Sequence, residues 1–254
     1  MNGAIYARVL FGASTVLFGI IGLMWHDADT WQTPYRILSL PLGTLIGDCL
    51  MIVLIAGGIG MLLPPTVRAS SIVLIVAYGL YSLAAIPGII DAPKTYVSYV
   101  GFFEGFAMTC GAIALLAATE AVSARSATIA RVARLGLGLC AVSFTLAQIF
   151  YLKFTASLVP TWISPGQMFL AIFTTIAFAL AAIAMLVDLQ ARLAMRLMTL
   201  MLALFGVLVW IPAVIAQPGA HGNWSEFALN FQITGAAWLV AVVQKGPGVL
   251  HSNA

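Results

Sequence analysis

The chain has 254 residues, of which 62% are hydrophobic and only 7% are charged, and its formal net charge is +3. A water-soluble domain carries about 25% charged and 45–50% apolar residues, so a soluble globular protein is excluded. The mean hydropathy of +1.07 agrees. We expect an all-α integral membrane protein, because a helix satisfies its own backbone hydrogen bonds in lipid.

Eight apolar runs follow one another, separated by polar or proline-rich breaks. Each run is long enough to cross the hydrocarbon, which takes about 20 residues at 1.5 Å per residue. The expected spans are 5–25, 42–63, 69–89, 97–118, 131–152, 166–187, 193–214 and 225–243. No small-residue cleavage site follows the first run, so we expect it to be a retained helix rather than a signal peptide.

Basic residues divide unevenly between the two sides of the membrane. The side with both termini carries eight: Arg8, Arg68, Arg125, Arg131, Arg134, Arg192, Arg196 and Lys245. The other side carries three: Arg36, Lys94 and Lys153. The positive-inside rule therefore predicts cytoplasmic N and C termini in the cytoplasmic (inner) membrane. A basic loop at a membrane edge favours lipid headgroups and does not imply nucleic acid.

This orientation is testable with reporter fusions. Reporters placed in the basic 119–130 loop and in the 25–40 loop should report opposite sides of the membrane. Equal accessibility of the two loops would contradict the orientation.

The chain also repeats itself. A shift of 124 residues aligns Pro41 with Pro165, Arg68 with Arg192, and the run 57–63 with 181–187. After a slip of one residue, "IPGIIDAP" (86–93) aligns with "IPAVIAQP" (211–218), and further on "CGAI" (110–113) aligns with "TGAA" (234–237). The matches keep their order along the chain, which indicates a tandem duplication.

Each repeat contains four spans, and an even number gives both copies the same orientation. We therefore expect two tandem four-helix bundles related by a pseudo-twofold axis along the membrane normal. The expected units are a first four-helix repeat (1–119), a basic cytoplasmic linker (120–130), and a second four-helix repeat with a short C-terminal tail (131–254).

The second half, with "FYLKFTASLVPTWISPGQMFLA" (150–171) and "AIAMLVDLQARLAMRLMTLML" (182–202), resembles DoxX-like membrane proteins. The first half is similar to a divergent copy, with "GGIGMLLPPTVRAS" (57–70) at the corresponding turn. The resemblance implies a four-helix unit and a membrane location. Relatives include a subunit of a thiosulfate:quinone oxidoreductase, which would imply a quinone-linked role, but the family provides no catalytic residue to transfer.

The loop "WHDADTWQ" (25–32) is unusually polar for so apolar a chain. On the predicted topology it faces away from the cytoplasm, where Trp25 and Trp31 suit the membrane interface. Two interpretations stay open: an aromatic belt with a turn, or the rim of an outward-facing site containing His26, Asp27 and Asp29.

Charged residues inside a membrane are costly and are therefore functional candidates. Asp48 and Glu104 lie in the outer half, each beside closely spaced glycines. Two interpretations stay open: the two carboxyls line the interior of the first bundle and share a proton, or each is a protonated carboxyl bonded to a neighbouring hydroxyl. In the eighth span Glu226, Asn230 and Thr234 recur every four residues, so they share one helical face. His221 lies near the outer surface at the level of His26. The candidate ligand-binding or proton-handling residues are thus His26, Asp27, Asp29, Asp48, Glu104, His221, Glu226 and Asn230.

The sequence carries no clear cofactor motif. His26 and His221 are weak metal candidates, because no His-x-x-x-His or Glu-x-x-His spacing supports them, and haem is disfavoured. Cys49, Cys110 and Cys140 fall inside apolar runs without a Cys-x-x-Cys motif, so we expect them to be buried small hydrophobes.

Three functions remain open. The first is an accessory or membrane-anchoring subunit of a redox system, touching quinone and needing a partner subunit or a second copy of the chain. The second is a transporter for a small solute or a proton, favoured by the repeat and the intramembrane carboxyls. The third is a scaffold without chemistry.

Overall fold

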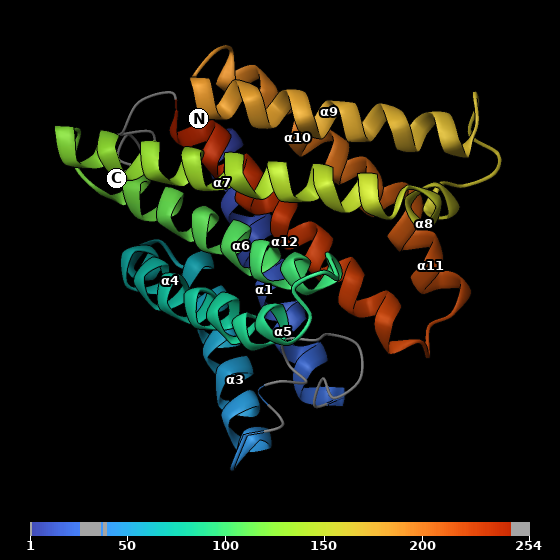
Figure 1. Cartoon of the computed structure of the whole chain (residues 1–254). Helices are drawn as coiled ribbons and strands as arrows, with labels where there is room; N and C mark the ends of the chain where they lie inside the picture. Colours follow the sequence, from blue (N-terminus) through green and yellow to red (C-terminus); the bar gives the residue numbers. More distant parts are fainter. Residues whose placement is uncertain (1, 26–36, 38–39, 245–254) are drawn as a thin grey trace.

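The structure is a computed structural model that describes residues 2–25, 37 and 40–244, and this part of the chain contains helices and no β-strand. Within these described residues, eight helices or helix groups are long and apolar enough to cross a membrane. The expectation of an all-α, multi-pass membrane protein is therefore confirmed by length and composition. Helix labels follow Figure 1.

The first four spans occupy residues 2–119. They are α1 (Asn2–Trp25), α3 (Gly43–Leu62), a third span built from η1 (Pro64–Thr66), α4 (Val67–Ala84) and α5 (Ile86–Asp91), and α6 (Val97–Thr119).

The last four spans occupy residues 124–243. They are α7 (Ala124–Phe150), α9 (Gln167–Val187), a seventh span built from α10 (Ala191–Phe205), η2 (Gly206–Trp210) and α11 (Ile211–Ala216), and α12 (His221–Val243). The short helix α8 (Leu152–Leu158) connects α7 to α9.

Helix α7 begins earlier than the sequence predicts. Its first residue is Ala124 rather than 131, so most of the expected linker 120–130 is helical. The reason is a capping box: the Ser123 side chain accepts from the Ser126 backbone N–H, and Ser126 Oγ accepts from the Ser123 N–H. Such a cap satisfies backbone donors at a helix start, and the alanines and arginine that follow are good helix formers.

The third and seventh spans are both interrupted, and both interruptions precede an Ile-Pro pair. α4 ends at Ala84 and α5 starts at Ile86 with Pro87 in its first turn. In the seventh span a π-helical turn, η2, precedes Pro212. Proline lacks the N–H of a regular helix and collides with the carbonyl one turn earlier, so a break or a widened turn relieves the clash.

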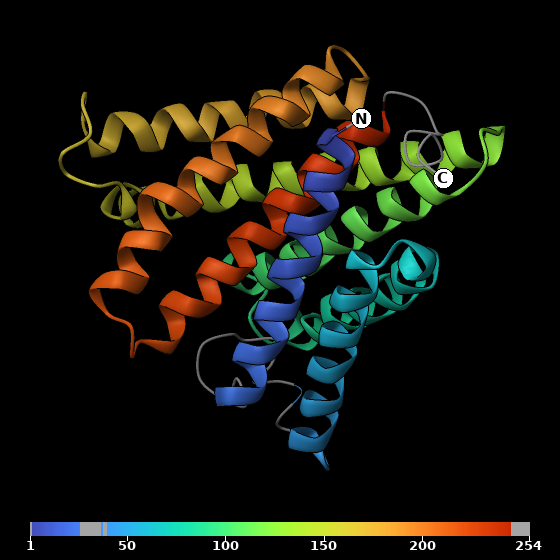
Figure 2. The same cartoon turned by 180° about the vertical axis from the view of Figure 1, so that it is seen from behind.

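Helices α1, α6 and α12 form the centre of the molecule. α12 packs against α1, α6 and α10. Inside the protein, 67% of the most apolar stretch of α12 is buried, whereas only 28% of the corresponding stretch of α3 is buried. In Figure 1, α9 and α10 lie on one side of this centre and α3 and α4 on the other. Figure 2 shows α1 crossing in front of α12, so the first and last spans are neighbours.

Two glycines permit the close approach of the central helices. A Cβ at Gly111 of α6 would lie 2.5 Å from Ala236 Cβ of α12. A Cβ at Gly235 of α12 would lie 2.8 Å from the Phe11 backbone of α1. Without a hydrophobic drive between helices in lipid, such close backbone packing provides the van der Waals contact that holds them together.

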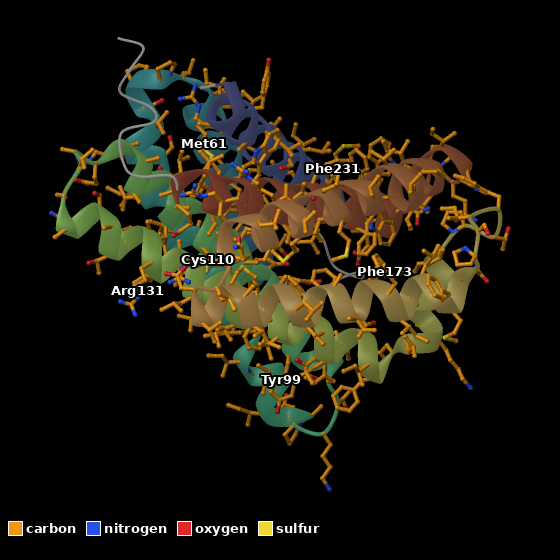
Figure 3. The ribbon with its side chains drawn as sticks, turned by 90° about the horizontal axis from the view of Figure 1, so that it is seen from above. Met61, Tyr99, Cys110, Arg131, Phe173 and Phe231 are labelled. Carbon is orange, nitrogen blue, oxygen red and sulfur yellow. The ribbon has the colours of Figure 1, made fainter. Side chains whose placement is uncertain are left out.

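Three arginines bind the ends of neighbouring helices, two of them from the first turn of their own helix and Arg134 from inside α7. Arg68 Nη2 lies 2.9 Å from Glu120 Oε1, and Arg192 Nη2 donates to the Gln244 carbonyl at 2.7 Å. Arg134, which is buried, donates to the Met185 carbonyl at 2.7 Å and pairs with Asp188 at 2.8 Å. Figure 3 shows Arg131 projecting away from the molecule at its edge.

The cysteine expectation holds for two residues and is wrong for the third. Cys110 and Cys140 are buried, and their thiols contact each other across α6 and α7. Cys49 is exposed on α3. Much of α3 faces outward, because this helix packs mainly on α1 and α4 at the periphery, so an apolar run alone does not decide which side faces lipid.

Candidate functional site

The polar loop of the sequence cannot be placed in the site. His26, Asp27, Asp29 and Trp31 lie outside the described residues, so the convergence of this loop on a site stays a prediction. The other candidates, Asp48, Glu104, His221, Glu226 and Asn230, are all described.

Glu104 of α6 and Glu226 of α12 form the centre of the candidate site. The two helices pack against each other, and the carboxyls are close enough for their charges to interact. Both side chains are half-buried. One of the two sequence interpretations pairs Asp48 with Glu104, and the structure does not support it: α3, which carries Asp48, packs on α1 and α4, while the charge that interacts with Glu104 is that of Glu226.

Asn230 lies one helical turn beyond Glu226, as the spacing predicts. Its side-chain oxygen is buried and has no hydrogen-bond partner among the described residues. A Cβ at Gly206, the first residue of the π-turn, would lie 2.8 Å from this oxygen and 2.5 Å from Phe231 Cζ. Figure 3 shows Phe231 between α12 and α10. The unpartnered amide oxygen therefore sits beside the interruption of the seventh span.

The interruption of the third span lies close to α6 near the level of Glu104. Gly105, the next residue of α6, packs on Ser82 of α4, and a Cβ there would lie 2.6 Å from Ser82 Oγ. Ser82 is three residues before the break at Ala85. Both interrupted spans thus contact the helices that carry the carboxyls, next to the polar residues.

His221 is the first residue of α12, at the end of its span, and its side chain is buried against the protein. Its ring stacks on Trp25 at the end of α1, with centroids 4.9 Å apart and planes 10° apart. Asn223 and Trp224 donate to the carbonyls of Ala213 and Pro218 and so fix the turn before α12. Trp25 therefore has a packing role in addition to the interfacial role that the sequence predicts.

A buried polar cluster joins α1, α4 and α12, and the sequence reasoning missed it. Thr15 Oγ1 and the Tyr78 hydroxyl lie 2.9 Å apart, and Gln232 Nε2 donates to Tyr78 at 3.0 Å. All three side chains are fully buried. The available signal was the presence of Gln232 in the middle of an apolar span, where a polar group needs a partner.

Within the described part of the chain, no group of three or more His, Cys, Asp and Glu side chains could hold a metal ion. His26 lies outside that part, so its pairing with His221 around a metal stays untested. The site chemistry that the described residues do offer is a pair of carboxyls with an amide oxygen nearby.

Comparison of the chain with models of protein families, with curated proteins and with solved structures gives no match.

Proposed function

We propose that this protein is a proton- or cation-coupled transporter of a small solute. The observation that carries the proposal is the packing of α6 against α12, with one glutamate on each helix, Glu104 and Glu226, whose charges interact. These helices are the last spans of the two sequence repeats. Substrate and coupling-ion sites of repeat-built transporters lie at the interface between repeats.

Electrostatics favours a cation at this pair. Two carboxylates close together in a low-dielectric environment repel each other, and each loses hydration energy. A proton or one monovalent cation held between them removes both costs. The unpartnered oxygen of Asn230, one turn from Glu226, adds a further oxygen ligand of the kind that hard cations prefer.

The interrupted spans support the same proposal. Interrupted hydrophobic segments at corresponding positions of two halves are the best structural pointer to a transport site. Here the breaks precede Pro87 and Pro212, which occupy corresponding places in the aligned "IPGIIDAP" and "IPAVIAQP" segments. Each break lies against the helix that carries one of the two glutamates.

We also propose that the two halves are related by a pseudo-twofold axis along the membrane normal. The main helix contacts of the first half have counterparts in the second: α1 on α3 matches α7 on α9, and α4 on α6 matches α10 on α12. The packing of α1 on α12 likewise matches that of α7 on α6. The contacts of Arg68 with Glu120 and of Arg192 with Gln244 also correspond under the shift of 124 residues.

The proposed location is the cytoplasmic (inner) membrane with both termini in the cytoplasm, on the charge asymmetry of the sequence. In this orientation Glu104 and Glu226 lie in the outer half of the membrane, because each follows the non-cytoplasmic start of its helix by about two turns or fewer. The site would then receive its cation from the outer side.

Labelling with a membrane-permeable carbodiimide tests the cation site. This reagent modifies carboxyls that carry a proton in an apolar environment, and we expect mass spectrometry to find the adduct on Glu104 or Glu226. Added Na⁺ or a higher pH should protect the pair. The matched control is Glu120, which pairs with Arg68 at a helix end and should not react. Equal labelling of all three glutamates, or none on the pair, would refute the site.

A second candidate function is the accessory subunit of a quinone-linked redox system, as the resemblance to DoxX-like proteins implies. The observation that favours it is the presence of paired aromatic rings on the two helices that carry the glutamates: Phe102 packs on Phe103 within two residues of Glu104, and Phe227, which follows Glu226, packs on Phe231. Flat rings of this kind suit a quinone headgroup. Co-purification of a redox partner subunit, with quinone bound, would favour this function. A scaffold protein would show neither redox activity with a partner subunit nor cation binding.

A further inference from the structure

The buried cluster of Thr15, Tyr78 and Gln232 lies near the middle of its three helices, α1, α4 and α12. It is therefore near the membrane midplane. It is separate from the carboxyl pair, because Gln232 follows Glu226 by almost two helical turns and faces α1 and α4.

The orientation of the Gln232 amide follows from its neighbours. One terminal atom of the side chain lies 3.0 Å from the Tyr78 hydroxyl and 3.4 Å from the Ser14 carbonyl oxygen. A carbonyl oxygen only accepts hydrogen bonds, so the atom facing it must be the NH₂ group. The other terminal atom is then the amide oxygen.

The donors of the cluster are all in use. The Thr15 hydroxyl donates to the Phe11 carbonyl at 2.7 Å, which leaves the Tyr78 hydroxyl to donate to Thr15 at 2.9 Å. The two N–H bonds of Gln232 point to Tyr78 and to Ser14. Because each donor of the cluster already has an acceptor, no group of the cluster is left to donate a hydrogen bond to the amide oxygen of Gln232.

The amide oxygen of Gln232 consequently lacks a hydrogen-bond donor. Gln232 Oε1 is buried and has no hydrogen-bond partner among residues 2–25, 37 and 40–244. A buried acceptor that gives up water without gaining a donor destabilises the fold. In native proteins such atoms are commonly satisfied by a bound molecule.

We infer that the Gln232–Tyr78–Thr15 cluster is a binding site for a small hydrogen-bond donor, which donates an O–H or N–H to Gln232 Oε1. The donor chemistry is shared by a water molecule and by the hydroxyl or amino group of a small solute. Anions and acceptor-only molecules are excluded, because they would place a lone pair against the amide oxygen.

An experimental structure of the full chain in lipid, at a resolution that orders water, tests this site. We expect non-protein density at about 2.7–3.2 Å from Gln232 Oε1. Gln148 is the matched control, since two hydroxyls lie beside its Oε1, Thr175 Oγ1 at 2.9 Å and Thr174 Oγ1 at 3.3 Å, and the Ala171 carbonyl needs only one of them as its donor. A comparable bound donor should not be needed there.

The outcome also separates the two sources of the donor. A single spherical peak that persists after exhaustive dialysis assigns water, whereas an elongated peak that dialysis removes assigns a solute. In either case the Gln232→Met variant should lose the density. A Gln232 Oε1 that packs against carbon atoms without density, or that accepts from a protein donor, overturns the inference and leaves the carboxyl site unaffected.

Discussion

Gly111→Ala and Gly235→Ala should each destabilise the folded protein by about 1–3 kcal/mol. At Gly111 the new methyl group would lie 2.5 Å from Ala236 Cβ and 2.7 Å from Ala236 Cα. At Gly235 it would meet the Phe11 Cα, Cβ and backbone N at 2.8 Å. Neither neighbour is the flexible end of a side chain, so the helices themselves must move apart. Leucine at either position should have a larger effect.

Gly79→Ala is the matched control for this prediction. Gly79 lies inside α4, and nothing is within 4 Å of a Cβ added there. Alanine at an unhindered helix position is neutral or stabilises by up to about 1 kcal/mol. Unfolding in mixed micelles by SDS titration measures all variants. Similar midpoints for Gly79→Ala, Gly111→Ala and Gly235→Ala would show that the central helices do not pack as closely as described.

Glu104→Gln and Glu226→Gln should each reduce cation-evoked charge movement at least about tenfold, and the double variant should be no worse than either single one. Groups that hold one proton or cation together act as a unit, so removing either carboxyl removes the site. The measurement is the transient current that a pH or Na⁺ jump evokes in proteoliposomes on a solid-supported membrane.

Glu120→Gln controls for the loss of a carboxyl as such. Glu120 pairs with the exposed Arg68, and such an ion pair contributes only about 0–1 kcal/mol, so the current of this variant should match that of the native protein. Independent, additive losses from Glu104→Gln and Glu226→Gln would contradict a shared site. Losses that follow the amount of folded protein in the vesicles would assign both glutamates a structural role.

The spans were predictable from sequence because the requirement is simple. A helix that crosses lipid needs a long apolar run and no external backbone partner, and each of the eight predicted runs overlaps a candidate span. The ends were less predictable. Ser123 extends α7 by its cap, and α12 begins at His221 rather than at 225, because local hydrogen bonds decide where a helix starts.

The candidate carboxyls were also visible, but their pairing was not. Asp48 and Glu104 have the same setting in the sequence, beside closely spaced glycines, and nothing local distinguishes one as the partner of the other. The pairing depends on which helices are neighbours. In the structure α6 packs on α12, so the charge of Glu104 interacts with that of Glu226 from a span far along the chain.

The sequence by itself determined that this protein is helical, has eight runs long and apolar enough to cross a membrane, and carries rare acids within them, because composition and run length are properties of the chain alone. Only the tertiary structure decided which polar groups meet. The cluster of Thr15, Tyr78 and Gln232 joins the first, third and eighth spans, and the outward position of Cys49 follows from the peripheral place of α3. Lipid solvates any apolar helix face equally well, so hydropathy cannot predict which face of a helix turns towards lipid and which packs inside the protein. Close backbone approach at glycines and the pairing of buried polar atoms make that choice, and both depend on residues far apart in the sequence.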